Sequence, residues 1–346
     1  MLLIKTLFMM YIYNMKKLFF IFLSLPFLFF SQSNIEFNFY DDCDNENFGK
    51  PNRTYGGNNW YGGFSDHLPI YCRFEAKTDI FTMFYNVENL FDTIDDPRRN
   101  DNSFLPNSKK KWNTNKYFNK LEKLERVFSN INSNKIPNLI GLCEIENEQV
   151  VDDLLKQPFF SNHTFNIIHQ ESPDMRGIDC AILYDEEFSF IESEFITVKI
   201  PGSDKPTRDI VFAKFEINNE ILNVFVNHWP SRWGGKNETE HKRVYAANIL
   251  KKYIEDNISK KENILIMGDF NDYPSDMSIN DNLIKAKNFD LVNLMTDLNC
   301  GSYNYKGKWG WLDQIIISSN LIEKRNLVVK DYGAFIKDWM LYKPKK

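Results

Sequence analysis

The 346-residue chain has few of the residues that build metal clusters or disulfide frameworks. Its five cysteines show no CxxC or CxxH spacing, which excludes a structural zinc site of the usual kind. An odd number of cysteines leaves at least one free thiol. Cys143 and Cys180 lie in apolar runs, so we expect both thiols to be buried and unreactive.

The sequence also lacks an excess of positive charge, a disordered composition and internal repeats. A formal net charge of −5 provides no overall basic field, so contact with nucleic acid would require a local basic patch or bound cations. With 43% hydrophobic and 15% aromatic residues, the chain is too apolar to be disordered. No repeat period of about 20–50 residues is present. The length suits one large domain or two small ones.

The apolar run that follows Met15 is too short to cross a bilayer. Two lysines precede it, and residues 18–30 fall short of the ~20 residues that a membrane span requires. This pattern is typical of a secretory signal peptide, and the alternative is a membrane anchor. We therefore expect a signal peptide at 1–31, a loop-rich stretch at 32–48, and a secreted or periplasmic protein with no membrane span after signal removal.

Apolar runs of two kinds predict a protein with both strands and helices. Short runs predict strands at 68–74, 80–87, 138–143, 178–184, 209–216, 221–227, 262–267 and 312–318. Apolar residues at i, i+3, i+4 spacing predict helices at 115–132, 148–156 and 239–255. Many strands with a few interposed helices favour two sheets packed face to face with helices outside.

Polar side chains recur where these strand-like runs end. One run ends at Gly268 and is followed by Asp269 and Asn271, which alternation would place on one side of an extended chain. This pair suits an oxygen-binding metal ion and a scissile phosphate, and the alternative is an Asx turn after a strand. Glu144 ends another run, where a carboxylate is costly without a cation or hydrogen bonds. The alternative, a polar residue that caps the following helix, fits Glu146 or Asn147 better than Glu144.

Further run ends add histidine, arginine and acidic side chains. His228 and Arg232 follow the run at 221–227, and a His near an Arg suits acid–base work beside a phosphate. A lone His is more often structural. The remaining run ends carry Asn86 and Glu88, Asp313, and the pair Asp66 and His67. Six polar run ends occur in one chain. A purely structural explanation for all six together is much less favoured than one for any single run end, so the set indicates a functional site.

The segments FYNVENLF, GLCEIEN, NHWPSR, MGDFND, WLDQI and SDHLP together resemble the endonuclease/exonuclease/phosphatase superfamily. The resemblance extends over roughly residues 49–340. With SPDMRGIDCAILY and PTRDI, the chain is most similar to a secreted bacterial, deoxyribonuclease-like branch. The resemblance implies a four-layer α/β sandwich, in which two packed mixed β-sheets are flanked by helices, and a single domain at 49–346.

The same resemblance implies a role for each polar run end. The metal site would be formed by Asn86 and Glu144, with Asp66 and Glu88 as further candidates. The catalytic group would consist of His67, Asp269, Asn271, His228 and Asp313, with Asp313 orienting His67. Phosphate contacts would come from Arg176, Arg208 and Arg232. The expected cofactor is Mg²⁺, with Mn²⁺ or Ca²⁺ as alternatives, because the ligands are oxygen and amide groups.

The function implied is hydrolysis of a phosphodiester by a metal-activated water. We expect a secreted endonuclease that acts on DNA, or on RNA, as a monomer with no stable protein partner. One alternative is a phosphatase or sphingomyelinase-like phosphodiesterase of the same superfamily. Another is a binding module that has lost catalysis, which the chemically competent residues at all the run ends disfavour.

The order of the motifs departs from that of the family. In family members the SDH strand closes the chain, whereas here the segment GKPNRTYGGNNWYGGFSDHLPIY begins at residue 49, ahead of the other motifs. We interpret this order as a circular permutation, in which 49–75 is equivalent to the family's C-terminal segment. The alternative is a fusion or a gene-model artefact. Permutation predicts a hairpin between 68–74 and 80–87 and places His67 within hydrogen-bond reach of Asp313.

Overall fold

The computed structural model describes Cys43 and residues 48–323 and 326–342. The expected signal peptide, and the expected loop-rich stretch apart from Cys43 and Phe48, lie outside the described residues. The part of the chain considered below belongs to one compact unit, Tyr40–Lys346. Each helix in this described part is too short or too polar to cross a membrane.

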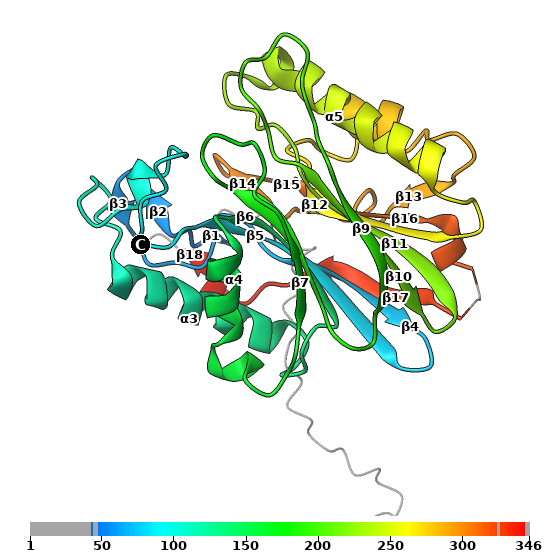
Figure 1. Cartoon of the computed structure of the whole chain (residues 1–346), viewed down its shortest axis with the longest axis horizontal. Helices are drawn as coiled ribbons and strands as arrows, with labels where there is room; N and C mark the ends of the chain where they lie inside the picture. The colour runs from blue at the N-terminus through cyan, green and yellow to red at the C-terminus, as the bar shows by residue number, and fades with distance from the viewer. Residues whose placement is uncertain (1–42, 44–47, 324–325, 343–346) are drawn as a thin grey trace, which may run out of the picture. The chain divides into compact units, whose positions relative to one another are not determined.

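Two six-stranded mixed sheets form the centre of the fold (Figure 1). The first sheet has the order β17 (Val328–Ala334), β4 (Ile70–Glu75), β5 (Asp79–Leu90), β6 (Leu139–Ile145), β8 (Asp179–Tyr184) and β7 (Asn166–His169). The second sheet has the order β13 (Leu291–Asn293), β16 (Asp313–Ser318), β12 (Asn263–Asp269), β11 (Glu220–His228), β10 (Ile210–Ile217) and β9 (Ser189–Ile196). Within these two sheets β5 pairs in parallel with β6 and β11 with β12, and the other pairs are antiparallel.

The inner faces of the two sheets pack directly against each other. At Gly141 of β6, an added Cβ would lie 2.8 Å from Val226 of β11 and close to Met267 of β12. A glycine is therefore needed there for the sheets to approach this closely. The central strands are covered on both faces, which explains why their sequences are continuous apolar runs rather than alternating ones.

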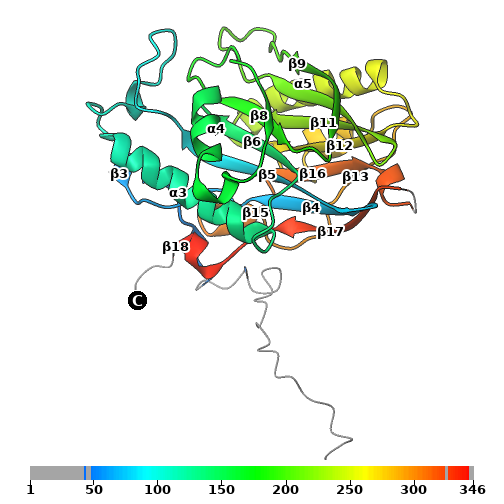
Figure 2. The same cartoon turned by 60° about the horizontal axis from the view of Figure 1, so that its bottom comes forward.

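Helices cover the two outer faces (Figures 1 and 2). Helices α3 (Thr114–Ile131) and α4 (Glu148–Leu155) lie on the first sheet, where Phe128 of α3 contacts Tyr85 of β5 with 6.3 Å between ring centroids. Helix α5 (Lys236–Asn257) packs on the second sheet through a core that includes Leu250 and Phe225. The predicted four-layer α/β sandwich is confirmed, and the three predicted helices are present with shifts of a few residues at their ends.

The remaining elements are short and lie outside the two sheets. Two-residue and three-residue strands form the pairs β1 (Lys50–Pro51) with β18 (Leu341–Tyr342), β2 (Tyr55–Gly56) with β3 (Asn59–Trp60), and β14 (Tyr303–Tyr305) with β15 (Lys308–Gly310). Single helical turns occur at η1 (Asn102–Phe104), η2 (Pro158–Phe160), η4 (Ser319–Leu321) and η5 (Asp338–Met340), and η3 (Met277–Leu283) is a π-helix packed on α5.

The N-terminal segment joins the C-terminal strands of the same chain. Strand β4 lies between β17 and β5, and the predicted β4–β5 hairpin is present, with Glu75 paired to Asp79. Lys50 and Pro51 of β1 pair with Tyr342 and Leu341 of β18. A circular permutation requires these pairings, and the equivalence of 49–75 to the family's C-terminal segment stays a prediction.

One disulfide, which the sequence analysis did not predict, joins Cys43 to Cys300, 257 positions apart. The other cysteines, Cys72, Cys143 and Cys180, are free and buried. The expectation of buried thiols at Cys143 and Cys180 is therefore confirmed. A free Cys72 is consistent with the odd cysteine count.

Candidate active site

The polar run ends meet at one end of the two sheets. In the second sheet, His228, Asp269 and Asp313 are direct neighbours across β11, β12 and β16. In the first sheet, Asn86 of β5 pairs with the residue before Glu144 of β6. The carboxyl ends of parallel strands lie at the same edge of a sheet, so both sheets present their polar residues to one place.

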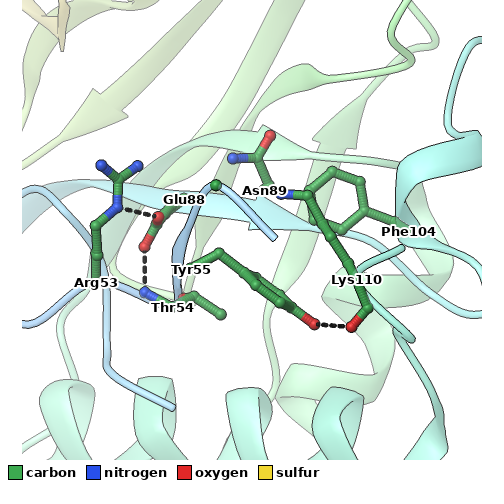
Figure 3. Close-up of a pocket in the computed structure, with 8 residues that line it drawn as sticks. Arg53, Thr54, Tyr55, Glu88, Asn89, Phe104 and Lys110 are labelled. Carbon is green, nitrogen blue, oxygen red and sulfur yellow. Dashed lines mark hydrogen bonds and ion pairs between the residues drawn. The ribbon is translucent and has the colours of Figure 1, made fainter. Parts of the chain in front are cut away.

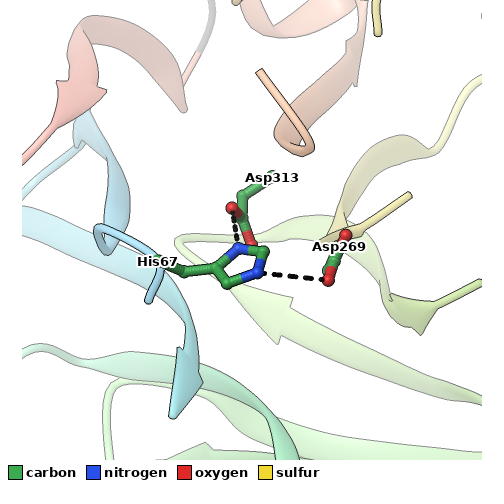
Figure 4. Close-up of side chains that lie close together, drawn as sticks. All are labelled: His67, Asp269 and Asp313. Carbon is green, nitrogen blue, oxygen red and sulfur yellow. Dashed lines mark hydrogen bonds and ion pairs between the residues drawn. The ribbon is translucent and has the colours of Figure 1, made fainter. Parts of the chain in front are cut away.

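His67 and Asp313 form a buried pair at this place (Figure 4). His67 Nδ1 lies 2.6 Å from Asp313 Oδ2, which confirms the distance predicted from the permuted order. The other ring nitrogen, Nε2, lies 3.8 Å from Asp269 Oδ2. The Ser302 hydroxyl also donates to Asp313, and the Tyr303 ring lies 4.7 Å from the imidazole. These contacts fix the orientation of the imidazole and direct Nε2 toward Asp269.

The two histidines of the site have opposite shifts in pKa. Burial alone would lower the pKa of His67, but the carboxylates of Asp313 and Asp269 outweigh burial and raise this pKa well above its ordinary value. Burial also lowers the pKa of His228, and here the nearby cations Arg208 and Arg176 lower it further. These shifts favour the charged form of His67 and the neutral form of His228.

Asp269 is buried between these groups, and its carboxyl holds a proton more tightly than usual. Burial raises its pKa to about 7, although the neighbouring His67 opposes the shift; the charge of Asp313 adds to it. Asn271 N–H donates to Asp269 Oδ1 over 2.9 Å. This contact is the Asx turn that was the alternative explanation of the motif, so the expected alternation of Asp269 and Asn271 along an extended chain is wrong. The Asn271 side chain instead donates to the carbonyl of Trp229.

Asn86 connects the carboxylates of the two sheets. Its amide nitrogen lies 3.1 Å from Asp269 Oδ2 and 3.4 Å from Glu144 Oε1, while its carbonyl oxygen accepts from Glu88 N–H. The backbone N–H of Asn89 donates to the other Glu144 oxygen over 2.9 Å. In this arrangement Asn86 positions the two carboxylates through its nitrogen, rather than presenting an oxygen to a cation.

The donor set fits a divalent cation. The side-chain nitrogen of Asn86 lies 3.4 Å from Glu144 Oε1 and 3.1 Å from Asp269 Oδ2, so the two carboxylates lie close together. Carboxylate oxygens are the ligands that Mg²⁺, Mn²⁺ and Ca²⁺ prefer. A second arrangement that could hold a metal ion is His67, Asp269 and Asp313, whose ligand atoms lie within 4.8 Å of one another. We favour the first, because His67 and Asp313 already share a 2.6 Å hydrogen bond. Both arrangements include Asp269.

Several site residues have left-handed backbone conformations that are rare outside glycine. Glu88, Asn89, Glu144 and Asn271 have φ values of 51°, 53°, 62° and 51°. The register of β5 with β6 shifts between Asn86 and Leu90, as at a β-bulge. Such conformations cost about 1 kcal/mol or more each and concentrate where a side chain must be re-aimed. They explain why simple strand alternation did not predict the directions of these side chains.

Glu88 and Asp66, both expected at the metal site, form ion pairs with Arg53 in the structure, and their metal role stays a prediction. Arg53 Nε lies 3.1 Å from Glu88 Oε1, and Arg53 Nη2 lies 2.9 Å from Asp66 Oδ2. Thr54 N–H donates to the second Glu88 oxygen over 2.6 Å. A guanidinium from the N-terminal segment thus neutralises both carboxylates that were expected to bind a metal. The pairing of Arg53 with Glu88 has no periodic signal in the sequence, because the tertiary fold brings the two residues together across 35 positions.

The three arginines expected at the phosphate lie in different surroundings. Arg208 is buried, and its Nη1 lies 3.1 Å from Asp174; Arg176 is half-exposed and contacts the same carboxylate. Both lie close enough to His228 to lower the pKa of that residue. Arg232 instead contacts Asp276, 2.7 Å away, and braces the loop that follows β12. Its guanidinium is engaged there, and the phosphate contact expected of Arg232 stays a prediction.

Four residues of the site neighbourhood were missed by the sequence analysis. They are Arg53, Asn89, Lys120 and Ser302. Lys120 of α3 is fully buried and donates to the Thr54 hydroxyl and the Phe64 carbonyl, which anchors the N-terminal segment. A buried lysine on the apolar stripe of an amphipathic helix was a usable signal, because such a position is costly unless the charge is satisfied.

Comparison with known proteins identifies the class. Residues 81–345 match the Endonuclease/Exonuclease/phosphatase family, and the chain belongs to this family. Its members are hydrolases that act on phosphoric esters, typically with a divalent metal. Among curated proteins, the chain is 29% identical over 145 residues to exodeoxyribonuclease III of Haemophilus influenzae. The match covers 41% of this chain and 51% of that protein, so the chain spans about half the length of the curated relative.

Solved structures of low sequence identity resemble the fold. A humanized D. rerio TDP2 matches with a TM-score of 0.48 and 14% identity, covering 73% of this chain and 84% of that one. The human Nocturnin catalytic domain matches with a TM-score of 0.40 and 17% identity, covering 53% of this chain and 69% of that one.

Proposed function

We propose that the protein is a secreted or periplasmic, Mg²⁺-dependent phosphodiesterase that cleaves DNA. The observation that carries the proposal is the buried His67–Asp313 pair, whose free ring nitrogen faces Asp269 beside Glu144. The family membership and the exodeoxyribonuclease relative support the reaction class and the substrate. A Cys43–Cys300 disulfide supports an oxidising compartment, because such bonds are rare in the cytosol.

The protonation states assign different tasks to His67 and Asp269. The raised pKa of His67 favours its charged form, which would donate a hydrogen bond from Nε2 to a phosphoryl oxygen and stabilise the charge that develops there. Asp269, with a pKa of about 7, accepts a proton from the attacking water. Asp313 keeps the imidazolium oriented, as a carboxylate partner of a catalytic histidine does.

The other side chains position the reacting groups. Asn86 holds the carboxylates of Asp269 and Glu144 at fixed places. Arg176 is half-exposed and is one of the two arginines that lower the pKa of His228, so it would contact a phosphate bound there. A divalent cation held by Glu144 would neutralise charge on the phosphate and on the departing oxygen.

A nicking assay tests the proposal directly. Purified protein without residues 1–31 should relax supercoiled plasmid, lose this activity in excess EDTA, and regain it with Mg²⁺ or Mn²⁺. His67→Ala, purified in the same way, should be inactive, which excludes contaminating nucleases. The exposed His163→Ala variant is the matched substitution and should keep its activity. Sphingomyelin and p-nitrophenyl phosphate are assayed in parallel. Full plasmid nicking in EDTA contradicts the cation requirement, and activity on sphingomyelin or the monoester alone contradicts the substrate.

A further inference from the structure

A cavity of about 150 Å³ lies near the candidate active site (Figure 3). It is formed by the N-terminal segment with Arg53 and Tyr55, by the end of β5 with Asn89, and by the connection from β5 to α3 with Phe104 and Lys110. Nothing in the proposed mechanism uses Tyr55, Phe104 or Lys110. The proposed mechanism therefore gives this cavity no role.

Lys110 supplies positive charge to this cavity. Its ammonium lies 4.6 Å from the centroid of the Tyr55 ring and 4.4 Å from that of Phe104. In the part of the chain that the structure describes, no carboxylate forms an ion pair with Lys110. The lining acid, Glu88, is already paired with Arg53. The ammonium is held in place by aromatic faces, and its charge remains available to an anion.

The rings that hold Lys110 belong to a packed aromatic cluster. Tyr55 contacts Trp60 and Trp112 with ring centroids 5.1 Å and 5.9 Å apart, and Phe104 contacts Trp112 at 6.0 Å. The Tyr55 hydroxyl donates to the carbonyl of Lys110 over 3.1 Å. These contacts keep the wall of the cavity and the backbone of Lys110 in a fixed position, as a preformed binding site requires.

Asn89 connects the cavity to the catalytic group. Asn89 lines the cavity, and its backbone N–H donates to Glu144 Oε2 over 2.9 Å. One residue, Asn89, therefore both lines the cavity and contacts a carboxylate of the candidate cation site, Glu144. A substrate with its scissile phosphate at that site would place a neighbouring group of the same chain near Lys110.

We propose that this cavity is a subsite for a second phosphate, the one that flanks the scissile phosphate in a nucleic acid strand. The inference rests on the proposed function and deepens it. Phosphate suits the fixed ammonium of Lys110, which forms no ion pair with a carboxylate in the described part of the chain. A lipid phosphodiester with a single phosphate would leave the subsite empty, so the cavity favours a polynucleotide substrate.

Dinucleotides with and without a terminal phosphate test the inference. KM and kcat are measured for a deoxydinucleotide and for its 5′-phosphorylated and 3′-phosphorylated forms, with wild type, Lys110→Gln, Lys110→Arg and Lys109→Gln. Lys109 is an exposed neighbour, so Lys109→Gln matches the charge change without touching the cavity. We expect one phosphorylated form to be preferred by wild type. Lys110→Gln should raise its KM roughly ten-fold, the size of one charge-assisted hydrogen bond, without changing the unphosphorylated substrate. Lys110→Arg should keep most of the preference.

The outcomes separate the two proposals. If wild type cleaves the dinucleotides but shows no preference that depends on Lys110, the subsite is wrong and the phosphodiesterase proposal stands. An equal effect of Lys110→Gln on all three substrates, or an equal effect of Lys109→Gln, also overturns the subsite. If wild type cleaves sphingomyelin but no dinucleotide, the proposed function fails and the subsite fails with it.

Discussion

The pairing of His67 with Asp313 should make the two residues act as one catalytic unit. Their atoms lie 2.6 Å apart in a buried place, and removal of either partner leaves the other without its function. We expect Asp313→Asn and His67→Ala each to lower kcat roughly 10³–10⁴-fold, up to the roughly 10⁴-fold loss that follows replacement of a carboxylate that orients a catalytic histidine. The double variant should lose little more, because the second change removes nothing that still works.

The expected coupling is large enough to measure clearly. If each single change costs roughly 10³-fold, independent effects would give roughly 10⁶-fold in the double variant, and a joint unit gives roughly 10³-fold. The difference corresponds to about 4 kcal/mol. Rates are measured on plasmid and on bis(p-nitrophenyl) phosphate at saturating Mg²⁺, with circular dichroism as the test of folding. Additive losses would refute the reasoning.

A second buried His–Asp pair in the same protein provides the control. His169 Nε2 lies 3.2 Å from Asp179 Oδ2, with both side chains almost fully buried. This pair joins β7 to β8, and within the described residues neither side chain forms a hydrogen bond with a catalytic candidate. His169→Ala should therefore lower the free energy of unfolding and leave kcat within a few-fold of wild type. A large loss of kcat there would show that any damaged His–Asp pair impairs the enzyme.

Two stability predictions follow from buried groups outside the catalytic pair. The pKa of Lys120 is lowered by burial from 10.5 to about 8, so the unfolded chain binds more protons between these values and wild type gains stability as pH rises through that window. Relative to Lys120→Met, the gain should be about 3 kcal/mol between pH 7 and pH 11 by denaturant unfolding, and parallel pH profiles would contradict it. Replacement of Cys300 by Ser should lower the free energy of unfolding by roughly 2–5 kcal/mol, since it opens a long loop of the unfolded chain. Unchanged denaturation midpoints with and without reductant would count against this.

The sequence predicted the strands that are buried on both faces and missed those at the sheet edges. Strands such as β6 and β12 are continuous apolar runs because another layer covers each face. Strand β9 is almost wholly exposed, and β13 has three residues, so neither has a hydrophobic pattern to detect. β17 alternates poorly because Lys330 and Asp331 interrupt it at an irregular register. Edge strands are defined by their hydrogen-bonded neighbour more than by burial.

At the candidate site, the sequence predicted which residues lie together, but it predicted few of their individual contacts. His67 was placed beside Asp313 across 246 positions, because motif order required it. The Asx turn after Asp269 was left as an alternative, and the structure has it together with a left-handed backbone at Asn271. Partners that come from loops, such as Ser302 on Asp313, have no periodic signal in the sequence. Hydrogen-bond partners between distant loops are set by the tertiary fold.

The last prediction concerns Arg53, which contacts two carboxylates, Asp66 and Glu88, that the sequence analysis expected at a metal ion. Its guanidinium neutralises Asp66 and Glu88, and Glu88 is buried. In Arg53→Ala the two carboxylates would face each other unpaired, so we expect a loss of about 1–2 kcal/mol in EDTA. This is less than the 3–5 kcal/mol for a fully buried pair, because Arg53 is 42% exposed.

A divalent cation should recover part of that loss, since the two freed carboxylates would then form a cation site. Binding to the folded state stabilises it in proportion to the logarithm of cation concentration, so the midpoint of Arg53→Ala should rise with added Mn²⁺ more steeply than that of wild type. Arg53→Lys, which keeps one charge, should show the smaller response of wild type. Equal slopes for wild type and Arg53→Ala would mean that these carboxylates cannot bind a cation even without the arginine. The role of Arg53 would then be structural alone, joining the N-terminal segment to β5 rather than occupying a metal position.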